Sequence, residues 1–413
     1  MKSVIVIGAG AAGVSAARAL HDAGVQVKIL EARNRLGGRL WTNRDFADHP
    51  IEFGGEYVHG DDISTQPIVR SLGLATVHWR KTDDSMIRLK DGRFFTMTEA
   101  RANDPELDQV RSWRLPDIKP RVDGETFTEF LTRGGWNADQ IHYVRRMFAN
   151  AVGGDPDVID AYQAMHDLDA YAGNDYRLLG GYDQVISHLA QGIDIRLNTV
   201  IESIAWGAGG VKIQAQDGTR YAADAAVVTL PVGVLKAGSV KFTPELPTEK
   251  TGALQKIAMS AVSKIILRFD TPVFRADIGA IYSAGCPPMW WSPTQGRPHR
   301  KHTVWSAFFS GRWAEKLYDM GEEKGVAYAL ETFRSEVGDK TITPSATKFV
   351  MWRDDPFAFG GYSVSLPGGF PGRTVLGKPT PPLYWAGEAT APTSTAHGAY
   401  DSGVRVAREI LGA

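Results

Sequence analysis

The sequence has little of what several classes of protein require. Its 413 residues include a single cysteine, Cys286, so the chain can form no internal disulfide and no cysteine metal site. It has no run of about 20 apolar residues, which excludes an ordinary membrane-spanning helix. The net charge is −1, with no basic stripe for nucleic acid and no acidic tail. Lys2 leads directly into an apolar run, so we expect no signal peptide in front of it and a cytoplasmic protein.

Two kinds of catalytic motif are also missing. The histidines show neither H-x-x-x-H nor H-E-x-x-H spacing, so we predict no metal site. A G-x-S-x-G nucleophile motif is absent as well. The hydrophobic content of 43% and charged content of 23% are those of a folded globular protein, and the length suits two domains.

The first forty residues predict a dinucleotide-binding unit. Residues 4–7 are typical of a buried strand, a G-x-G-x-x-G turn follows, and residues 25–30 form a second strand that ends at Glu31. The glycines permit, in chain order, a tight turn, the approach of a pyrophosphate and close packing of the helix: Gly8, Gly10 and Gly13. The helix N-terminus around Ala12 would hold the phosphates, and Glu31 would accept hydrogen bonds from a ribose. This unit alone leaves NAD and FAD open.

The residues that follow favour FAD. They read E-A-R-N-R-L-G-G-R and resemble the second signature of a flavoprotein group that includes amine oxidases, phytoene desaturases and protoporphyrinogen oxidase. In that group the last arginine, here Arg39, reaches back to the FAD pyrophosphate, to which a guanidinium can make bidentate contacts. The resemblance implies that four residues of this stretch contact the cofactor: Ala32, Arg33, Gly38 and Arg39.

A second glycine pair lies within residues 51–60, and glycines let a backbone approach a ligand closely. The segment resembles one that passes beside the isoalloxazine ring in amine oxidases, which implies cofactor contacts by Gly54, Gly55 and Glu56. Its ending, Y-V-H-G, resembles the W-I-H-G of polyamine-type oxidases, in which the histidine points into the substrate site. His59 is therefore a candidate catalytic residue, with a loop histidine of no role as the alternative.

Two further segments are expected beside the cofactor. Residues 193–201 read as a strand that lies by the adenine in the family, with Val200 or Ile201 supplying a backbone contact. Trp352 is a further candidate for cofactor contact. Between these two segments in the sequence, residues 322–337 have the pattern of an amphipathic helix.

Lys264 is unusual because it stands in residues 261–269, a strand that is otherwise mainly apolar. A lysine is costly to bury unless something requires it. In amine oxidases the matching lysine holds a water against flavin N5, so Lys264 is a candidate catalytic residue. An exposed lysine on an edge strand is the alternative.

The last sixty residues resemble the closing motif of flavin amine oxidases, F-A-G-E followed by H-G-A-Y-x-S-G. The resemblance implies cofactor contacts by four residues, with the carboxylate of the second on the ribityl chain: Gly387, Glu388, Ala399 and Tyr400. A helix that begins in this motif would face the flavin pyrimidine, where its N-terminus stabilises negative charge.

Tyr362 and Tyr400 match two aromatic positions that flank the substrate amine in the family, so we expect two facing rings that form a slot. Gly361 departs from the monoamine oxidases, which carry a cysteine just before this tyrosine and bind FAD covalently. We therefore predict non-covalent FAD.

The expected fold is α/β: a Rossmann-like FAD-binding domain of the glutathione-reductase-2 type with an inserted α+β substrate domain built on a mixed sheet and helices. The FAD-binding domain would comprise residues 1–76, 176–246 and 356–413, and the substrate-binding domain residues 77–175 and 247–355. The acid-rich segment 155–175 could attract cationic substrates or form a solvated helix face.

The sequence is thus identified as a member of the flavin-containing amine oxidase family, on the polyamine oxidase side. The family implies that a neutral primary or secondary amine, a polyamine for example, loses hydride to flavin N5, that the imine hydrolyses to an aldehyde, and that O₂ becomes H₂O₂. Alternatives are a desaturase or porphyrinogen oxidase, an amine dehydrogenase with another acceptor, an idle FAD-binding scaffold and a histone-type demethylase. The chain could be a monomer or a homodimer.

Overall fold

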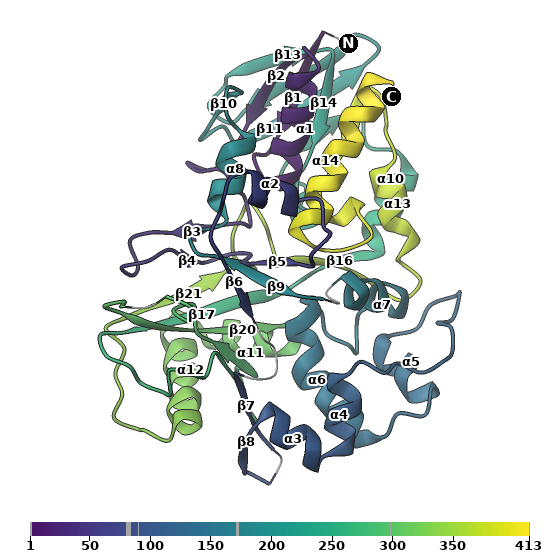
Figure 1. The fold of residues 1–413 in the computed structure, drawn as a ribbon. Helices are drawn as coiled ribbons and strands as arrows, with labels where there is room; N and C mark the ends of the chain where they lie inside the picture. Colours follow the sequence, from purple (N-terminus) through teal and green to yellow (C-terminus); the bar gives the residue numbers. More distant parts are fainter. Residues whose placement is uncertain (1, 80–83, 90, 171–172, 298, 413) are drawn as a thin grey trace.

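A computed structural model describes residues 2–79, 84–89, 91–170, 173–297 and 299–412. The molecule has two parts, with a parallel sheet and both chain termini at one end and a larger sheet flanked by helices at the other (Figure 1). The predicted substrate segment 77–175 includes residues 80–83, 90 and 171–172, which lie outside the described residues.

The first part is built on five parallel strands in the order β10-β2-β1-β14-β23. Their bounds are β1 Ser3–Ile7, β2 Gln26–Leu30, β10 Asp194–Arg196, β14 Ala225–Val228 and β23 Leu383–Trp385. These strands are short and rich in buried Val, Ile and Ala, as expected for a parallel sheet covered on both faces. The predicted strand over residues 193–201 is shorter than expected, because Asn198 has a positive φ of 53° and turns the chain.

Helices cover one face of this sheet and a second sheet covers the other. Helix α1 (Ala11–Asp22) packs along α14 (Ala396–Leu411), with α8 (Asp183–Leu189) beside them (Figure 1). The second sheet has the order β13-β12-β11-β15. Its bounds are β11 Ile201–Gly207, β12 Gly210–Ala215, β13 Arg220–Ala223 and β15 Lys241–Thr243.

The second part is built on seven strands in the order β21-β17-β20-β19-β18-β7-β8. Their bounds are β7 Ser85–Arg88, β8 Phe94–Thr96, β17 Val262–Phe269, β18 Ala280–Tyr282, β19 Met289–Trp291, β20 Thr303–Ser310 and β21 Ala346–Met351. One face packs against α11 (Gly311–Met320) and α12 (Glu322–Val337), and the latter matches the predicted amphipathic helix. On the other face, α3 and α6 pack against the strands and three further helices pack on them, and together they share one apolar core with the sheet: α3 Met97–Asn103, α4 Pro105–Arg111, α5 Phe127–Arg133, α6 Ala138–Val152 and α7 Ala161–Ala170.

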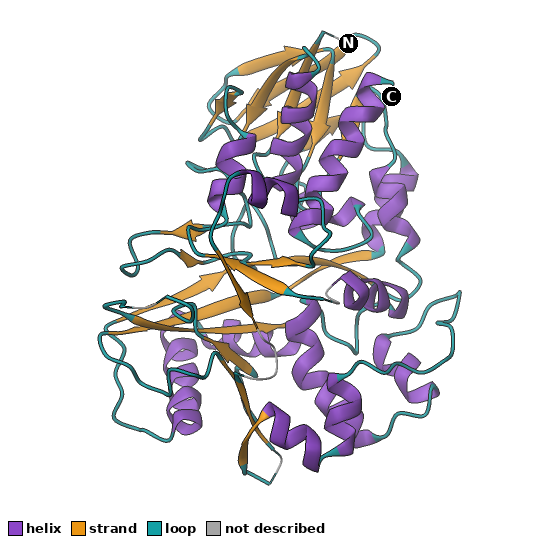
Figure 2. Cartoon of the chain, viewed as in Figure 1, coloured by secondary structure: helices purple, strands orange, loops and turns teal. Residues whose placement is uncertain are grey.

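Smaller elements connect the two parts (Figure 2). Strand β16 (Ile257–Ser260) pairs with β22 (Tyr362–Ser365), and β9 (Asp175–Leu178) lies between β5 (Tyr57–His59) and β6 (Thr76–Trp79). The remaining elements are β3 Thr42–Asn43, β4 Ile51–Glu52, α2 Gln66–Ser71, α9 Val232–Lys236, α10 Thr248–Gln255, α13 Pro371–Gly377 and the 3₁₀ turn η1 Glu388–Thr390.

The two largest sheets follow the expected α/β plan. All strands of the five-stranded sheet come from segments assigned to the FAD-binding domain, and all strands of the seven-stranded sheet come from the substrate segments. The domain boundaries themselves stay a prediction. Strand β6 begins at Thr76 and runs across the predicted boundary between residues 76 and 77. Within the described part of the chain, no helix has the length and apolar character needed to cross a membrane. The cytoplasmic location also stays a prediction.

Candidate active site

A continuous cavity of about 860 Å³ lies where the two parts of the molecule meet. It runs along the carboxyl ends of β1 and β2, which is where open α/β sheets bind their ligands. The sequence-predicted residues that line it are Gly8, Gly10, Ala12, Glu31, Ala32, Arg33, Gly38, Arg39, Gly54, Gly55, Glu56, His59, Val200, Ile201, Lys264, Trp352, Tyr362, Gly387, Glu388 and Ala399. Gly13 and Tyr400 are not among the described lining residues.

Gly13 lies just behind the wall of the cavity. A Cβ at this position would lie 1.9 Å from the backbone oxygen of Gly8, so only glycine lets α1 pack this closely against the turn. Gly8 has φ +104°, which L side chains rarely adopt. Glu31 accepts hydrogen bonds from the backbone N–H of Ala9 at 2.7 Å and of Arg33 at 2.8 Å, and these contacts fix its carboxylate beside the turn.

Arg39 and Glu388 bring together two motifs that are far apart in the sequence. Arg39 donates from Nη1 to Glu388 Oε1 at 2.8 Å and to the Gly361 carbonyl at 2.7 Å. Burial alone would raise the pKa of Glu388, but the guanidinium groups of Arg39 and Arg373 outweigh burial and hold it below its usual value. Glu388 therefore remains a carboxylate inside the protein.

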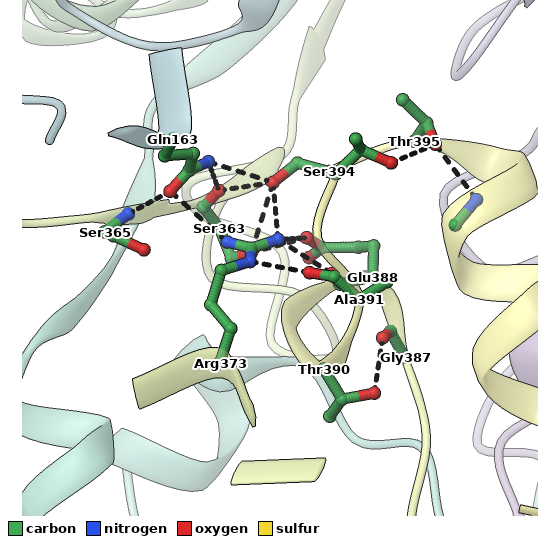
Figure 3. A network of polar contacts seen from close by, with 12 residues as sticks. Gln163, Ser363, Ser365, Arg373, Gly387, Glu388, Thr390, Ala391, Ser394 and Thr395 are labelled. Atoms are coloured by element: carbon green, nitrogen blue, oxygen red, sulfur yellow. Dashed lines mark hydrogen bonds and ion pairs between the residues drawn. The ribbon is translucent and has the colours of Figure 1, made fainter. Parts of the chain in front are cut away.

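Arg373, which the sequence reasoning missed, supports this region from behind (Figure 3). Its buried guanidinium donates to the carbonyls of Glu388 and Ala391, both at 2.8 Å, and to the hydroxyls of Ser394 at 2.9 Å and Ser363 at 3.0 Å. A buried arginine held by carbonyls and hydroxyls has no local sequence signal, because its partners are set by tertiary packing. Arg373 thus holds the turn that presents Glu388.

Lys264 is buried, with 4% of its surface exposed, so the edge-strand alternative is wrong. Its Nζ donates to the Glu52 carbonyl at 2.9 Å and to Glu56 Oε2 at 2.8 Å. Arg177, which the sequence reasoning also missed, donates from Nε to Glu56 Oε1 at 2.8 Å. Glu52 lies next to this group, and burial raises the pKa of its carboxyl to about 7.

His59 lies at the cavity and is oriented by a carboxylate. Its Nδ1 is 2.7 Å from Asp175 Oδ1. Within the acid-rich segment 155–175, Asp169 and Asp175 line the cavity. The other aspartates contact groups of the protein itself, two of them in exposed ion pairs with Arg312 and two of them buried: Asp155, Asp157, Asp160 and Asp167. The segment is therefore partly a wall of the cavity and partly structural.

The two tyrosines that were predicted to face each other differ in their surroundings. Tyr362 lines the cavity, and burial raises its pKa to about 12. Tyr400 instead packs against the core of the first part and is not among the described residues that line the cavity. Ala396 and Ala399, on the same helix, do line it, and the slot between the two tyrosine rings stays a prediction. Thr395, the N-cap of α14, lies at the cavity and was not identified from the sequence.

The second part of the molecule adds an apolar wall to the cavity. Its apolar and aromatic members are Trp79, Trp113, Leu115, Met147, Leu168, Tyr282, Met289, Trp291 and Phe308. Arg111 is a charged residue on this wall, with its guanidinium 5.3 Å from the centre of the Tyr282 ring. These residues come from several helices and strands, so no local sequence motif predicts that they lie together.

The residues present fit a flavin dinucleotide. Among the described residues, Arg39 uses only Nη1 for hydrogen bonds to protein, which leaves Nε and Nη2 for an anionic ligand. Helix α1 begins at the cavity without a side-chain cap, so its first N–H groups can bind phosphate. Gly54 permits the close approach of its strand, because a Cβ there would lie 1.9 Å from the Arg39 carbonyl. In the described part of the chain, no group of three His, Cys, Asp or Glu side chains could hold a metal ion.

The fold and the cavity are those of a flavoprotein in which a dinucleotide-binding part and a second part enclose one cavity. The family model described as flavin containing amine oxidoreductase matches residues 11–411, and the chain belongs to this family. It is 30% identical over 444 residues to polyamine oxidase 4 of Oryza sativa subsp. japonica, covering 98% of this chain and 88% of that protein. It is also 27% identical to lysine-specific histone demethylase 2 of Homo sapiens, but it spans only 53% of that protein.

Solved structures show the same fold. A putrescine oxidase bound to putrescine superimposes with a TM-score of 0.84 at 22% identity, covering 100% of this chain and 99% of the other. Cyclohexylamine oxidase from Brevibacterium oxydans IH-35A gives a TM-score of 0.82 at 22% identity, with the same coverage. The chain is accordingly a flavin-dependent amine oxidase, and its substrate is an amine.

Proposed function

We propose that the protein binds FAD non-covalently and oxidises a primary or secondary amine, a polyamine or diamine being the first candidate. The supporting observation is the continuity of the cavity. One space joins the dinucleotide motif at Glu31 to Lys264, Tyr362 and His59. A cofactor seated at the first end would extend toward the side chains at the other.

FAD, when bound, would accept a hydride from the carbon next to the amine nitrogen and pass the electrons to O₂, which becomes H₂O₂. The side chains prepare this step. Tyr362 restricts how the substrate can lie, and His59, held by Asp175, orients it. Lys264 would hold a water at the cavity wall, and the α14 N-terminus would stabilise negative charge. The imine released by the reaction then hydrolyses to an aldehyde and an amine or ammonia.

Acidic side chains support a substrate with more than one amine. Asp169 and Asp175 are the aspartates of the acid-rich segment at the cavity, and carboxylates attract a second ammonium group. The similarity to polyamine oxidases points in the same direction. The apolar wall favours a different substrate, a single amine with a bulky apolar body, and it is the specific observation behind that second candidate.

An anaerobic amine panel tests the proposal. We expect diamines and polyamines to bleach the flavin absorbance of the purified holoenzyme. Bleaching by arylalkylamines would instead support the second candidate, a substrate selected by the apolar wall. Asp169→Asn is the matched variant: it should weaken reduction by diamines about tenfold and leave arylalkylamines unchanged. A flavin that no amine reduces would overturn the proposal. Flavin reduction by an amine without H₂O₂ formation in air would instead indicate a dehydrogenase.

The pH dependence gives a second test. If the neutral amine binds, no general base is required, and the rate of flavin reduction should rise with pH through the pKa of the substrate amine. Stopped-flow reduction from mildly acidic to alkaline pH measures this. A flat profile would count against binding of the neutral amine.

Cysteine placement supports non-covalent FAD. Cys286, the one cysteine of the chain, is buried in the core between the seven-stranded sheet and α12, and it is not among the described residues that line the cavity. After acid or heat denaturation, we expect a yellow supernatant and a colourless precipitate. Colour that stays with the precipitated chain would contradict this.

A further inference from the structure

Glu56 lies in a buried cluster of charges at the cavity wall. Its Oε1 accepts from Arg177 Nε at 2.8 Å, and its Oε2 accepts from Lys264 Nζ at 2.8 Å and from Trp291 Nε1 at 3.0 Å. The side chains of Glu56, Arg177 and Lys264 are 2%, 4% and 5% exposed. Both carboxylate oxygens are therefore occupied by protein donors, which does not suit the direct cofactor contact expected from the sequence.

Lys264 has a donor left over in this arrangement. Among the described residues, its ammonium donates to the Glu52 carbonyl and to Glu56, which accounts for two of its three N–H bonds. Its Nζ lies 5.2 Å from the centre of the Trp291 ring, which supports a cation from one side. Since Lys264 also lines the cavity, the third N–H is available to a water or ligand there.

We propose that Glu56 is a positioning residue that keeps Lys264 in its ammonium form and aims it at the flavin end of the cavity. The proposal rests on the proposed function, because it takes Lys264 to act beside bound FAD. A buried lysine without a counter-ion tends to lose its proton, whereas a carboxylate in contact with it favours the charged form. Glu56 supplies that carboxylate, and Arg177 and Trp291 hold Glu56 in place.

The other charged groups around Lys264 do not replace Glu56. Glu52 offers Lys264 only its backbone carbonyl, while its carboxylate accepts from Thr42 and from the Tyr182 N–H. The further titratable and charged groups near the cluster are Tyr57, Asp175, Arg177 and Arg297. Two of these, Arg177 and Arg297, are cations, and they disfavour a further positive charge on Lys264. Burial alone would raise the pKa of Glu56, but Lys264 and Arg177 lower it, so the carboxylate stays ionised.

The test compares reduction potentials of bound FAD across pH. In Glu56→Gln, Lys264 loses its counter-ion, and buried lysines can titrate several pH units below their ordinary value. We expect the variant potential to lie above that of the wild type at low pH. It should fall toward the wild type through an extra inflection between about pH 6 and 9. The visible spectrum of the oxidised flavin should change over the same interval.

Three further variants identify the group that titrates. Glu56→Gln combined with Lys264→Met must lose the extra inflection. Arg177→Gln removes a different member of the cluster but leaves the Glu56–Lys264 pair, so it should show no extra inflection. Glu56→Asp restores the negative charge and should return the profile toward the wild type.

Several results would overturn the proposal. These are a Glu56→Gln holoenzyme with the wild-type profile, an inflection that persists in the double variant, and a Glu56→Asp variant that behaves like Glu56→Gln. Neither the potential nor the spectrum requires a substrate. An amine panel that fails would thus count against the proposed function and leave the test of Glu56 intact.

Discussion

At the scale of single residues, the cavity depends on which way neighbouring side chains point. Ala399 and Tyr400 are adjacent on α14 and both pack against the core of the first part, but Ala399 lines the cavity and Tyr400 is not among its described lining residues. Tyr362 reaches the cavity from β22, and its ring fits against Gly153, where a Cβ would lie 2.5 Å from Tyr362 Cδ2. Tyr362 therefore borders the cavity together with Tyr57 and Tyr282, whereas Tyr400 is not among the described lining residues.

The same substitution at both tyrosines tests this placement. Tyr362→Leu should lower kcat/KM about tenfold, because it removes a rigid ring from the cavity wall. Tyr400→Leu should change kcat/KM by less than about twofold and act mainly on stability, because its ring packs against the core of the first part and is not among the described groups that line the cavity. Steady-state kinetics with an amine from the panel, together with thermal unfolding, measure both effects. Equal losses of kcat/KM in the two variants would indicate that both tyrosine rings border the substrate.

Gly361 offers a second test at this scale. A Cβ at residue 361 would lie 2.3 Å from Val262 Cβ, so a larger residue cannot enter without moving β17 or β22. We expect Gly361→Cys to lower the free energy of unfolding by about 1–3 kcal/mol and to leave FAD non-covalent. Gly361→Ala is the matched control, since it introduces the same Cβ without a thiol. Flavin retained on the precipitated Cys variant would contradict this expectation.

At the scale of elements, the predictable parts were those with local signals. The βαβ unit follows from glycine spacing and apolar runs, and α12 follows from its helical period. Arg177, Arg373 and Asp167 had no such signal, because each is a polar residue whose burial depends on partners that are distant in the chain. The slot between Tyr362 and Tyr400 stays a prediction for a related reason: a motif match gives a position on a helix, while the surrounding packing decides what the side chain reaches.

The contact between α1 and α14 yields a prediction at this scale. A Cβ at Gly403 would lie 2.1 Å from Ser15 Oγ and 2.2 Å from the Ala12 carbonyl. Gly403→Ala should push the two helices apart, lower the free energy of unfolding by about 1–3 kcal/mol and weaken FAD binding, since both helix N-termini line the cavity. Chemical denaturation and flavin titration measure these changes.

Gly252 in α10 supplies the control for this substitution. No atom lies within 4 Å of a Cβ built there, so Gly252→Ala should stabilise the protein by about 0.5–1 kcal/mol through helix propensity. A Gly403→Ala protein as stable as the wild type would show that the helices can separate without cost.

At the scale of the whole molecule, a buried polar network beside Glu388 at the cavity wall joins the two parts. Helix α7 belongs to the second part, and its Gln163 donates to Ser394 Oγ and to the Ser363 carbonyl, both at 3.3 Å. Asp167, one turn further along α7, accepts from Gln163 Nε2 at 3.1 Å. Burial raises the pKa of Asp167 to about 7, although Arg373 acts in the opposite direction. The junction between the two parts therefore contains a carboxyl group that is costly to ionise.

This raised pKa makes the stability of the whole molecule depend on pH. Between about pH 4 and 7 the folded protein holds a proton on Asp167 that the unfolded chain releases, so this group's contribution to stability falls as the pH rises. Asp167→Asn keeps a neutral side chain of the same shape and removes that dependence. The stability of the variant relative to the wild type should therefore rise by about 2–3 kcal/mol from pH 5 to pH 8, as measured by denaturant unfolding. Asp169→Asn, exposed on the same helix, controls for the change in net charge. A difference that stays constant with pH would mean that Asp167 is already ionised in the folded protein at pH 5.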